Sequence, residues 1–294
     1  MTTTNSLRRS PLWRLAAALS LLLLCGAGAP PSLALEATPA WLGGDEVAVK
    51  VMSYNIHHAV GSDGALDLQR IGQVIAASGA DVVGLQEVDR HWSARSGFED
   101  QALRLAEQLD MHYVFAANLD REPLVEGGSR RQYGTAVLSK YPIIRHENQF
   151  LTSGPSEQRG LSMATINVKG TELHLFNTHL GLSTEERKTQ AAEIVEIVGD
   201  HEGPSILLGD LNAAPDTEEV RIVAARYLDA FADRSDAYTF PAAIPRIRAD
   251  YIFYSDGLEL ASSEVIPTLA SDHLPVTAVF RLQRAAPSKY GIGH

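Results

Sequence analysis

Asp210 and Asn212 follow a short apolar segment, residues 206–208, which has the composition of a buried strand. Side chains two positions apart on an extended segment point to the same side, so this carboxylate and this carboxamide can share one site. Strand ends in layered α/β proteins suit functional residues, because the rigid sheet holds the exposed side chains in position. Gly-Asp and Asn are also ordinary turn residues, and the pair alone does not separate a functional site from a turn.

Five further segments place polar side chains at the edges of predicted strands. They are Ser53-Tyr54-Asn55, Gln86-Glu87, Asn177-Thr178-His179, Arg248-Ala249-Asp250-Tyr251 and Ser271-Asp272-His273. Each of them alone has an ordinary explanation, such as a helix cap, a surface charge or a histidine of the core. Six such segments at strand edges are much less expected by chance, and together they favour one shared site.

In order and spacing, these segments resemble the motifs of the endonuclease/exonuclease/phosphatase superfamily, whose members are similar to deoxyribonuclease I, abasic-site endonucleases, inositol polyphosphate phosphatases and neutral sphingomyelinases. The pieces that carry the resemblance are Tyr54-Asn55, Gln86-Glu87, Asn177-Thr178-His179, Gly209-Asp210-Leu211-Asn212 and Ser271-Asp272-His273. The resemblance covers roughly residues 47–282. It implies a four-layer α/β sandwich and divalent-metal hydrolysis of a phosphoester.

Metal binding is the first role that this chemistry needs. A phosphoester resists attack because it is anionic, and a bound cation polarises the phosphoryl oxygen and steadies the leaving group. Hard cations such as Mg²⁺ bind oxygen ligands, usually one or two carboxylates together with waters and substrate. We therefore expect Mg²⁺ or Mn²⁺, with Glu87 as the primary ligand, Asn55 beside it, and Asp272 completing or backing the shell. The number of ions, one or two, stays open.

Activation of the attacking water is the second role. His273, oriented by Asp250, is expected to form a histidine–carboxylate pair, because a carboxylate fixes the tautomer and favours the protonated ring. In the family pattern Asp210 lies close enough to be the base instead, or to protonate the leaving group, and the sequence does not divide these roles. Asn212 and His179 are expected to donate hydrogen bonds to phosphoryl oxygens as charge grows there.

Other polar and aromatic residues are weaker candidates. Tyr133 lies where family members often place a site tyrosine or another substrate contact. Arg159 is explained equally well as a phosphate contact or as a solvated surface arginine. His57 and His58 are expected at the mouth of the site, where a ligand role is the less favoured interpretation, and Tyr54 is expected to serve packing. The sequence has no Gly-x-Ser-x-Gly elbow, no His-Glu-x-x-His motif and no Walker-type glycine loop.

The elements that must hold these residues read as alternating strands and helices. Strands are predicted at 47–53, 81–86, 112–116, 135–139, 143–150, 161–168, 172–177, 206–208, 249–254, 258–265 and 275–282. Helices are predicted near 68–76, 102–109 and 217–226, and after a capping box at 183–186, with a surface loop at 118–132. These elements predict one catalytic domain over 46–284 of the α/β (α+β) class, with two mixed sheets packed face to face and helices outside.

The N-terminus reads as a secretory signal over residues 1–34. Arg8, Arg9 and Arg14 precede an apolar run at 15–24, and small residues follow up to Ala34. We expect an exported protein, periplasmic or extracellular after cleavage, with a loose lead-in over 35–45 and a frayed tail over 285–294. Twin-arginine export, an uncleaved anchor and lipidation at the only cysteine are less favoured alternatives.

The net charge of the chain favours some classes of substrate over others. The formal net charge is −11, and removing a leader with three of the 25 basic and none of the 36 acidic residues would make it −14. Proteins that bind duplex DNA nonspecifically are usually basic, so a lipid or small-molecule phosphoester is favoured over a nucleic acid, although Arg130, Arg131 and Lys140 could form a local basic patch.

Nuclease activity is the main alternative function, and a catalytically silent binding module is a remote one. The expected partner is the phosphoester itself (phospholipid, inositol phosphate or nucleic acid), with membrane contact through a lipid substrate and no obligate protein partner.

Overall fold

A computed structural model describes residues 46–199 and 201–283 of the chain. The leader predicted over 1–34, the lead-in over 35–45 and the tail over 285–294 lie outside the described residues. Within the described residues, no helix is both long enough and apolar enough to span a bilayer.

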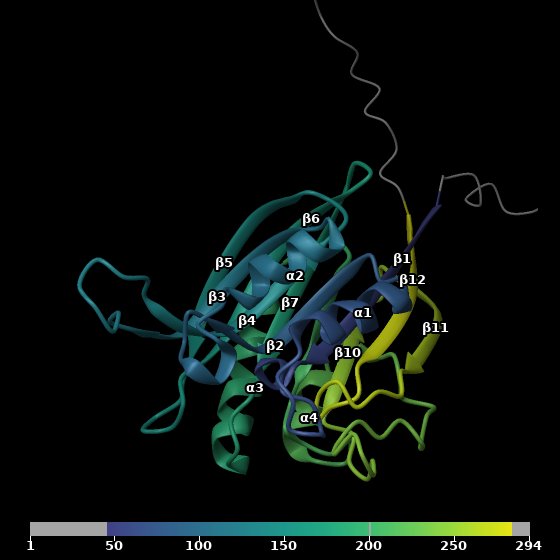
Figure 1. The fold of residues 1–294 in the computed structure, drawn as a ribbon. Coiled ribbons are helices and arrows are strands. Elements are labelled where there is room, and N and C mark those ends of the chain that lie inside the picture. The colour runs from purple at the N-terminus through teal and green to yellow at the C-terminus, as the bar shows by residue number, and fades with distance from the viewer. Residues whose placement is uncertain (1–45, 200, 284–294) are drawn as a thin grey trace, which may run out of the picture. The chain divides into compact units, whose positions relative to one another are not determined.

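The described residues form two six-stranded sheets (Figure 1). The first sheet has the strand order β11-β12-β1-β2-β4-β3, and the second has the order β5-β6-β7-β8-β10-β9. The bounds are β1 Glu46–Asn55, β2 Val82–Arg90, β3 His112–Arg121, β4 Arg131–Ser139, β5 Ile143–Leu151, β6 Arg159–Val168, β7 Thr171–His179, β8 Ser205–Asp210, β9 Leu228–Asp229, β10 Asp250–Tyr254, β11 Glu259–Val265 and β12 Val276–Gln283. Each sheet contains a parallel pair, β1 with β2 and β7 with β8, among antiparallel neighbours, so both sheets are mixed.

Helices cover the outer face of each sheet. Their bounds are α1 Leu68–Ser78, α2 Gln101–Leu109, α3 Thr184–Gly199 and α4 Glu218–Ala224, with short 3-10 turns η1 His57–Ala59 and η2 Ala94–Ser96. Alternate strand residues face opposite layers: Val82 packs between the two sheets, whereas Val83 packs under α1 and α2. In the second sheet Leu208 faces the other sheet and Leu207 faces α3 and α4. This is the predicted four-layer sandwich, and the fold prediction is confirmed.

Two local predictions about the helix and packing residues are also confirmed. Ser183 Oγ accepts a hydrogen bond from the backbone N of Glu186 (3.3 Å), which is the cap predicted for the start of α3. Tyr54 is fully buried in the core between the first sheet and its helices.

The predicted end of β2 is wrong. The strand does not stop at Glu87 but continues to Arg90, and its pairing with β4 shifts register between Leu85 and Val88. Glu87 itself has a φ of 55°, as expected for an irregular residue at a bulge. The apolar run ends at residue 85, but the ladder continues because it is built from backbone groups, which do not require apolar side chains.

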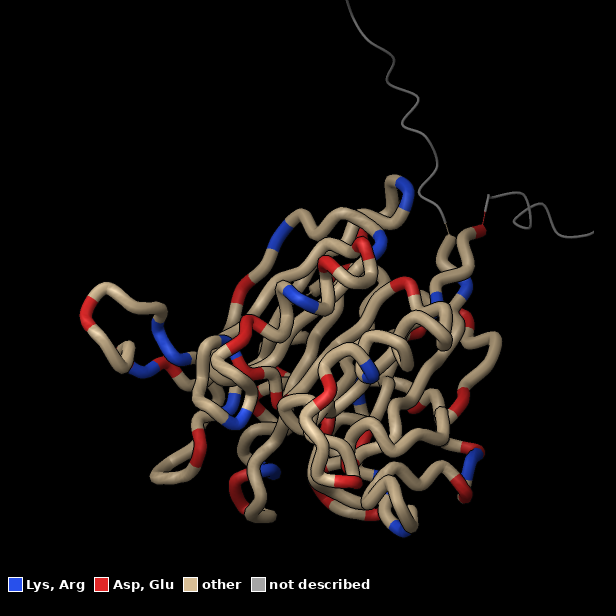
Figure 2. Tube along the Cα trace, viewed as in Figure 1, with Lys and Arg blue, Asp and Glu red and all other residues tan. Residues whose placement is uncertain are grey.

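The predicted loop at 118–132 is shorter than expected. β3 and β4 stay paired out to Arg121 opposite Arg131, which leaves residues 122–130 as the connection. Arg130 forms ion pairs with Asp120 and Glu122, and Lys140 pairs with Asp81. Acidic and basic positions therefore alternate on this hairpin (Figure 2), and the local basic charge considered from the sequence is largely neutralised.

The two sheets approach closely beneath the strand ends that carry polar residues. Gln86 Nε2 of β2 donates to Asn177 Oδ1 of β7 (2.7 Å), and Asn177 Nδ2 donates to the carbonyl oxygens of Leu85 (3.0 Å) and Ala136 (2.9 Å). Gly84 has no side chain where Leu208 of the opposite sheet packs. These buried contacts fix how the ends of β2 and β7 face each other.

Gly84→Ala should destabilise the protein by about 1–3 kcal/mol, because the added methyl group would overlap Leu208 in a closely packed core. The matched control is Gly199→Ala at the end of α3, where a methyl group meets nothing within 4 Å. Denaturant unfolding of both variants measures the difference. Equal stability of the two variants would show that the sheets separate at Gly84 without cost.

Candidate active site

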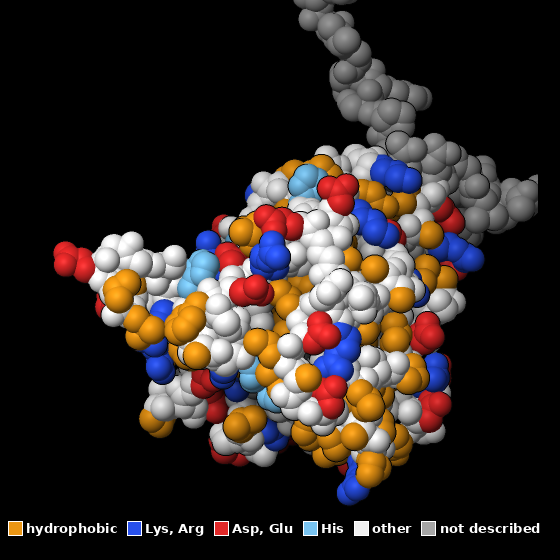
Figure 3. All heavy atoms as spheres, in the orientation of Figure 1, with side chains coloured by type: hydrophobic (Ala, Val, Ile, Leu, Met, Phe, Trp, Pro, Cys, Tyr) orange, Lys and Arg blue, Asp and Glu red, His pale blue; other side chains and the backbone are white. Residues whose placement is uncertain are grey.

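The ends of the two parallel strand pairs bring the predicted residues to one edge of the sandwich. Asn55 ends β1 beside Gln86 of β2. In the second sheet His179 ends β7 beside Asp210, the last residue of β8, and Asp210 pairs in turn with Asp250, the first residue of β10. Histidine side chains reach the surface in the view of Figure 3, close to charged ones.

Asn55 connects two carboxylates. Its Nδ2 donates to Glu87 Oε1 and to Asp210 Oδ2, each over 3.0 Å, and its Oδ1 accepts from the backbone N of His57 (3.1 Å). The orientation of the amide is fixed, because only the nitrogen can donate to carboxylates and only the oxygen can accept from N–H. Asn55 therefore presents its nitrogen, not its oxygen, to Glu87. Metal ligation through Oδ1, as predicted, would require the amide to rotate.

Asp210 lies at the centre of the group. Its Oδ1 accepts from the backbone N of Asn212 (2.8 Å), and its Oδ2 lies 3.5 Å from His179 Nε2 and 3.6 Å from His273 Nε2. Burial raises the pKa of Asp210 to about 6, against the lowering effect of His273. Asp210 is therefore ionised at neutral pH but close enough to its pKa to exchange a proton.

His273 and Asp250 form the predicted pair. His273 Nδ1 lies 2.9 Å from Asp250 Oδ2, and the ring packs against Phe240 at 4.7 Å between centroids. Burial on its own would lower the pKa of His273, but the carboxylates of Asp250 and Asp210 raise it to about 10. The ring is thus an imidazolium at neutral pH, with Nδ1–H donating to Asp250 and Nε2–H directed toward Asp210.

His179 lies in the opposite electrostatic environment. Arg159 Nη1 is 3.0 Å from His179 Nδ1, and because a guanidinium can only donate, Nδ1 accepts and Nε2 carries the hydrogen. Burial, together with the charges of Arg159 and His273, holds the pKa of His179 well below its usual range. His179 is a neutral ring whose Nε2–H faces Asp210. The amide nitrogen of Asn212 lies 3.0 Å from Nε2 and donates to the carbonyl oxygen of Leu180 (2.9 Å).

Arg159 is buried rather than solvated, with 6% of its surface exposed. Its Nη1 also pairs with Glu157 Oε1 (2.7 Å), and its buried Nε has no hydrogen-bond partner among the described residues. Tyr133 is buried beside the same charges: burial first, then Glu87 and Glu157, raise the pKa of its hydroxyl. The structure brings both weaker candidates to the site.

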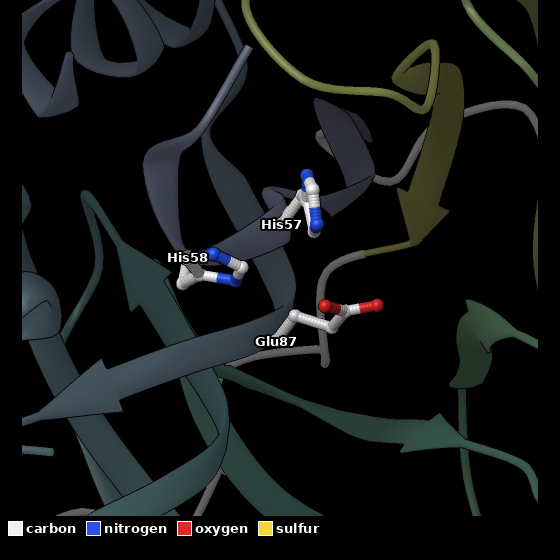
Figure 4. A group of neighbouring side chains, drawn as sticks. All are labelled: His57, His58 and Glu87. Atoms are coloured by element: carbon white, nitrogen blue, oxygen red, sulfur yellow. The ribbon is translucent and has the colours of Figure 1, made fainter. Parts of the chain in front are cut away.

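Glu87 and Asp272 both lie near His57, and Glu87 also lies near His58. His57 and His58 come from η1, directly after β1, and both rings turn toward the carboxylate of Glu87 (Figure 4). Asp272 Oδ1 is 3.7 Å from His57 Nδ1 and 3.3 Å from Ser271 Oγ. Placing these residues together does not test their roles, and the catalytic, metal and substrate roles of all predicted site residues stay predictions.

Some residues beside the site were not found from the sequence. Glu157 lies in a polar stretch with no motif, and Arg95 is in a 3-10 turn that was not predicted. Arg95 pairs with the buried Asp89 through two bonds (2.7 and 2.9 Å) and lies over the Tyr133 ring (5.4 Å). Trp92 packs 5.9 Å from Tyr133. Their only sequence signal was proximity to a predicted site residue: Trp92 and Arg95 follow the strand that carries Glu87, and Glu157 lies two residues before Arg159.

Known proteins share both this sequence pattern and this fold. The model of the endonuclease/exonuclease/phosphatase family matches residues 52–273. The chain belongs to this family. YbhP of Escherichia coli K12 is 28% identical over 254 residues, which cover 81% of this chain and 98% of YbhP. A family structure from Beutenbergia cavernae is 29% identical with a TM-score of 0.68, over 80% of this chain and 72% of that one.

A third similar protein is a mannosyl-6-phosphatase of Bacteroides thetaiotaomicron, which is 20% identical with a TM-score of 0.63 over 79% of this chain and 99% of that one. At this identity the similarity shows the fold alone. Members of the family are phosphoesterases and nucleases, so the chain is a hydrolase of the phosphoester-cleaving class, and the family generally uses a divalent metal. The side chains around Glu87 fit such an ion, because the carboxylate is only partly buried and ring nitrogens of His57 and His58 lie nearby.

Asp250→Asn should leave His273 neutral at a pH of about 8, where the wild-type ring is protonated. The substitution removes the charge that raises the pKa of His273 most, whereas burial, which lowers this pKa more strongly than the remaining charge of Asp210 raises it, stays in place. The ¹⁵N chemical shifts of the ring nitrogens measure the protonation state. Asp236→Asn, at an exposed carboxylate paired with Arg234, is the control and should leave the ring unchanged. If His273 stays protonated in Asp250→Asn, the charge of Asp250 is not the cause of its protonated state.

Proposed function

We propose that the protein is an exported, divalent-metal-dependent phosphoesterase that hydrolyses a lipid or small-molecule phosphoester by in-line attack of water. The observation that carries this proposal is the group around Asp210 at one edge of the two sheets: Asn55 donates a hydrogen bond to its Oδ2 (3.0 Å), and His179 Nε2 and His273 Nε2 lie 3.5 and 3.6 Å from the same oxygen. Such a group offers a proton acceptor and several donors within a few ångströms of each other, which is what displacement at phosphorus requires.

Asp210 is the proposed general base. His273 lies between the carboxylates of Asp250 and Asp210, which favours its protonated form and leaves it without a free lone pair. Asp210 is then the residue of this pair that can accept the proton of the attacking water. The new P–O bond forms as the bond to the leaving oxygen, on the opposite side of phosphorus, breaks. Asp210 later releases the proton of the attacking water to solvent, and the leaving oxygen takes a proton from solvent. His273 acts as a charged donor to the phosphoryl group.

His179, Asn212 and Arg159 are the proposed contacts to phosphoryl oxygens. His179 donates through Nε2–H, and Arg159 holds the ring in the tautomer that makes this possible. The unpaired, buried Nε of Arg159 is a further donor that an anionic group would satisfy. Donors fixed before the reaction stabilise the developing charge without reorganising.

Glu87 would hold the divalent cation, with Asp272, 3.7 Å from His57 Nδ1, as a further carboxylate. Mg²⁺ and Mn²⁺ are the ions predicted from the sequence. When bound, such an ion polarises the phosphoryl oxygen and stabilises the leaving oxygen. Asn55 keeps the carboxylates of Glu87 and Asp210 in fixed relative positions.

The acidic net charge of −11 supports a lipid or small-molecule phosphoester as the substrate. A structural relative of the same fold is a mannosyl-6-phosphatase, which supports a small substrate by analogy only. Nuclease activity is the second candidate, and one contact favours it: Trp92 is partly exposed and lies under the guanidinium of Arg121 (4.7 Å), a platform on which a base could stack. Membrane contact is proposed only through a lipid substrate.

Export is proposed from the leader over residues 1–34. Expression of the full chain in a bacterial host should yield a periplasmic or secreted protein that begins after Ala34. Cell fractionation and N-terminal sequencing measure both points. A cytoplasmic protein that still carries residues 1–34 would contradict export and leave the enzymatic proposal intact.

Hydrolysis of bis(p-nitrophenyl) phosphate with Mg²⁺ or Mn²⁺ is the first enzymatic prediction. EDTA should abolish turnover, and His273→Ala and Glu87→Gln should each lower kcat at least about 100-fold. Circular dichroism checks that the variants fold. Turnover of sphingomyelin, inositol phosphates and plasmid DNA then distinguishes the substrate classes. No turnover with any divalent metal would favour a binding module.

The pH dependence of kcat/KM should be bell-shaped. The rate rises about tenfold per pH unit up to a pH of about 6, because Asp210 must be ionised to accept a proton. It levels off and falls again above a pH of about 10, because His273 must be protonated to donate. Asp210→Asn should abolish the acid limb together with most activity, whereas Asp236→Asn should leave both unchanged. An acid limb retained in Asp210→Asn would assign the base to another group.

A further inference from the structure

We propose that His57, His58 and Glu87 form a mixed imidazole–carboxylate site for a first-row transition-metal ion such as Mn²⁺, Co²⁺ or Zn²⁺. One ring nitrogen of each histidine and one carboxylate oxygen of Glu87 lie within 4.8 Å of one another (Figure 4). Two imidazole donors separate this set from the oxygen-only set that Mg²⁺ prefers. The inference identifies the cation of the proposed phosphoesterase and rests on that function for its role, but ion binding itself does not require turnover.

The tautomer of His57 suits a metal ligand. His57 Nδ1 lies 3.1 Å from the carbonyl oxygen of Val60. A carbonyl can only accept, so Nδ1 carries the hydrogen and Nε2 keeps its lone pair. Histidines that bind metals are usually held in this way, with one ring nitrogen donating to a carbonyl or carboxylate and the other free for the ion.

His58 carries a nitrogen that lacks a partner. Its Nδ1 is buried and makes no hydrogen bond within the described part of the chain. The backbone of the residue is fixed, because Gln101 Nε2 donates to its carbonyl oxygen (2.8 Å). Buried polar atoms are rarely left unpaired, and a bound cation would give this ring the partner that the protein does not supply.

All three residues have the same uncommon backbone conformation. His57, His58 and Glu87 have φ values of 44°, 42° and 55°, a region that residues other than glycine seldom occupy. The two rings lie 4.5 Å apart at an interplanar angle of 67°. Ligands bound to one ion at about 2.0–2.2 Å are roughly 3–4 Å apart, so small side-chain rotations close the site.

The test is direct metal binding by the wild type and by the double variant His57→Asn/His58→Asn. Asparagine tolerates positive φ better than most residues and offers oxygen but no imidazole. The visible absorption of bound Co²⁺ reports nitrogen ligation, and competition with Zn²⁺ and Mg²⁺ gives relative affinities. His112→Asn, at an exposed histidine of β3, is the matched control.

The wild type and His112→Asn should bind Zn²⁺ and Co²⁺ at least about 100-fold more tightly than Mg²⁺. The double variant should lose tenfold or more of its Zn²⁺ and Co²⁺ affinity, shift its Co²⁺ spectrum toward oxygen ligation and keep its Mg²⁺ affinity. An unchanged spectrum and affinity in the double variant would overturn the inference, as would a wild type that prefers Mg²⁺. Histidine-dependent binding without any turnover would uphold the site and refute the proposed function instead.

Discussion

Asn55 Nδ2 donates to Glu87 Oε1 and to Asp210 Oδ2, each over 3.0 Å, and the second of these bonds crosses from one sheet to the other. Asn55 and Glu87 belong to the first sheet and Asp210 to the second. The same strand end also holds the segment before β12, because Ser271 Oγ donates to the carbonyl oxygen of Asn55 (2.8 Å) and accepts from the backbone N of His273. One residue therefore sets the relative positions of a metal-side carboxylate, a buried carboxylate and an imidazolium.

Hydrogen bonds are needed at this edge because the apolar packing between the two sheets does not by itself fix their relative position. Its residues are mostly Val, Leu, Ile and Ala, and apolar burial alone tolerates sliding of one layer over another. The buried bond from Gln86 to Asn177 and the close approach of Leu208 at Gly84 remove that freedom just beneath the site. Buried polar networks that are well satisfied specify one arrangement in this way.

The architecture and the main polar segments of the site could be predicted from the sequence. Asp210, His179 and Asn55 could be assigned to one shared site because each lies at the end of a predicted strand, and the family resemblance supplied their order. The features that the sequence could not predict depend on the surroundings of a residue in the fold, not on the residue type. Arg159 looks like a surface residue until β6 buries it against His179, and Glu87 looks like the end of a strand because a bulge leaves no apolar signal.

The histidines show how far environment governs the site. His273, between two carboxylates, is held protonated, whereas His179, under the guanidinium of Arg159, is held neutral. Burial and the charge of Arg95 lower the pKa of His58 to about 4, so this ring too is neutral at physiological pH. A neutral imidazole can bind a cation and an imidazolium cannot, so the neutral ring of His58 near Glu87 and the charged ring of His273 near Asp210 suit different tasks. The neighbouring charges therefore divide this edge into a side whose imidazole is able to accept a cation and a side whose imidazolium is able to donate protons and hydrogen bonds, although both sides use the same side chain.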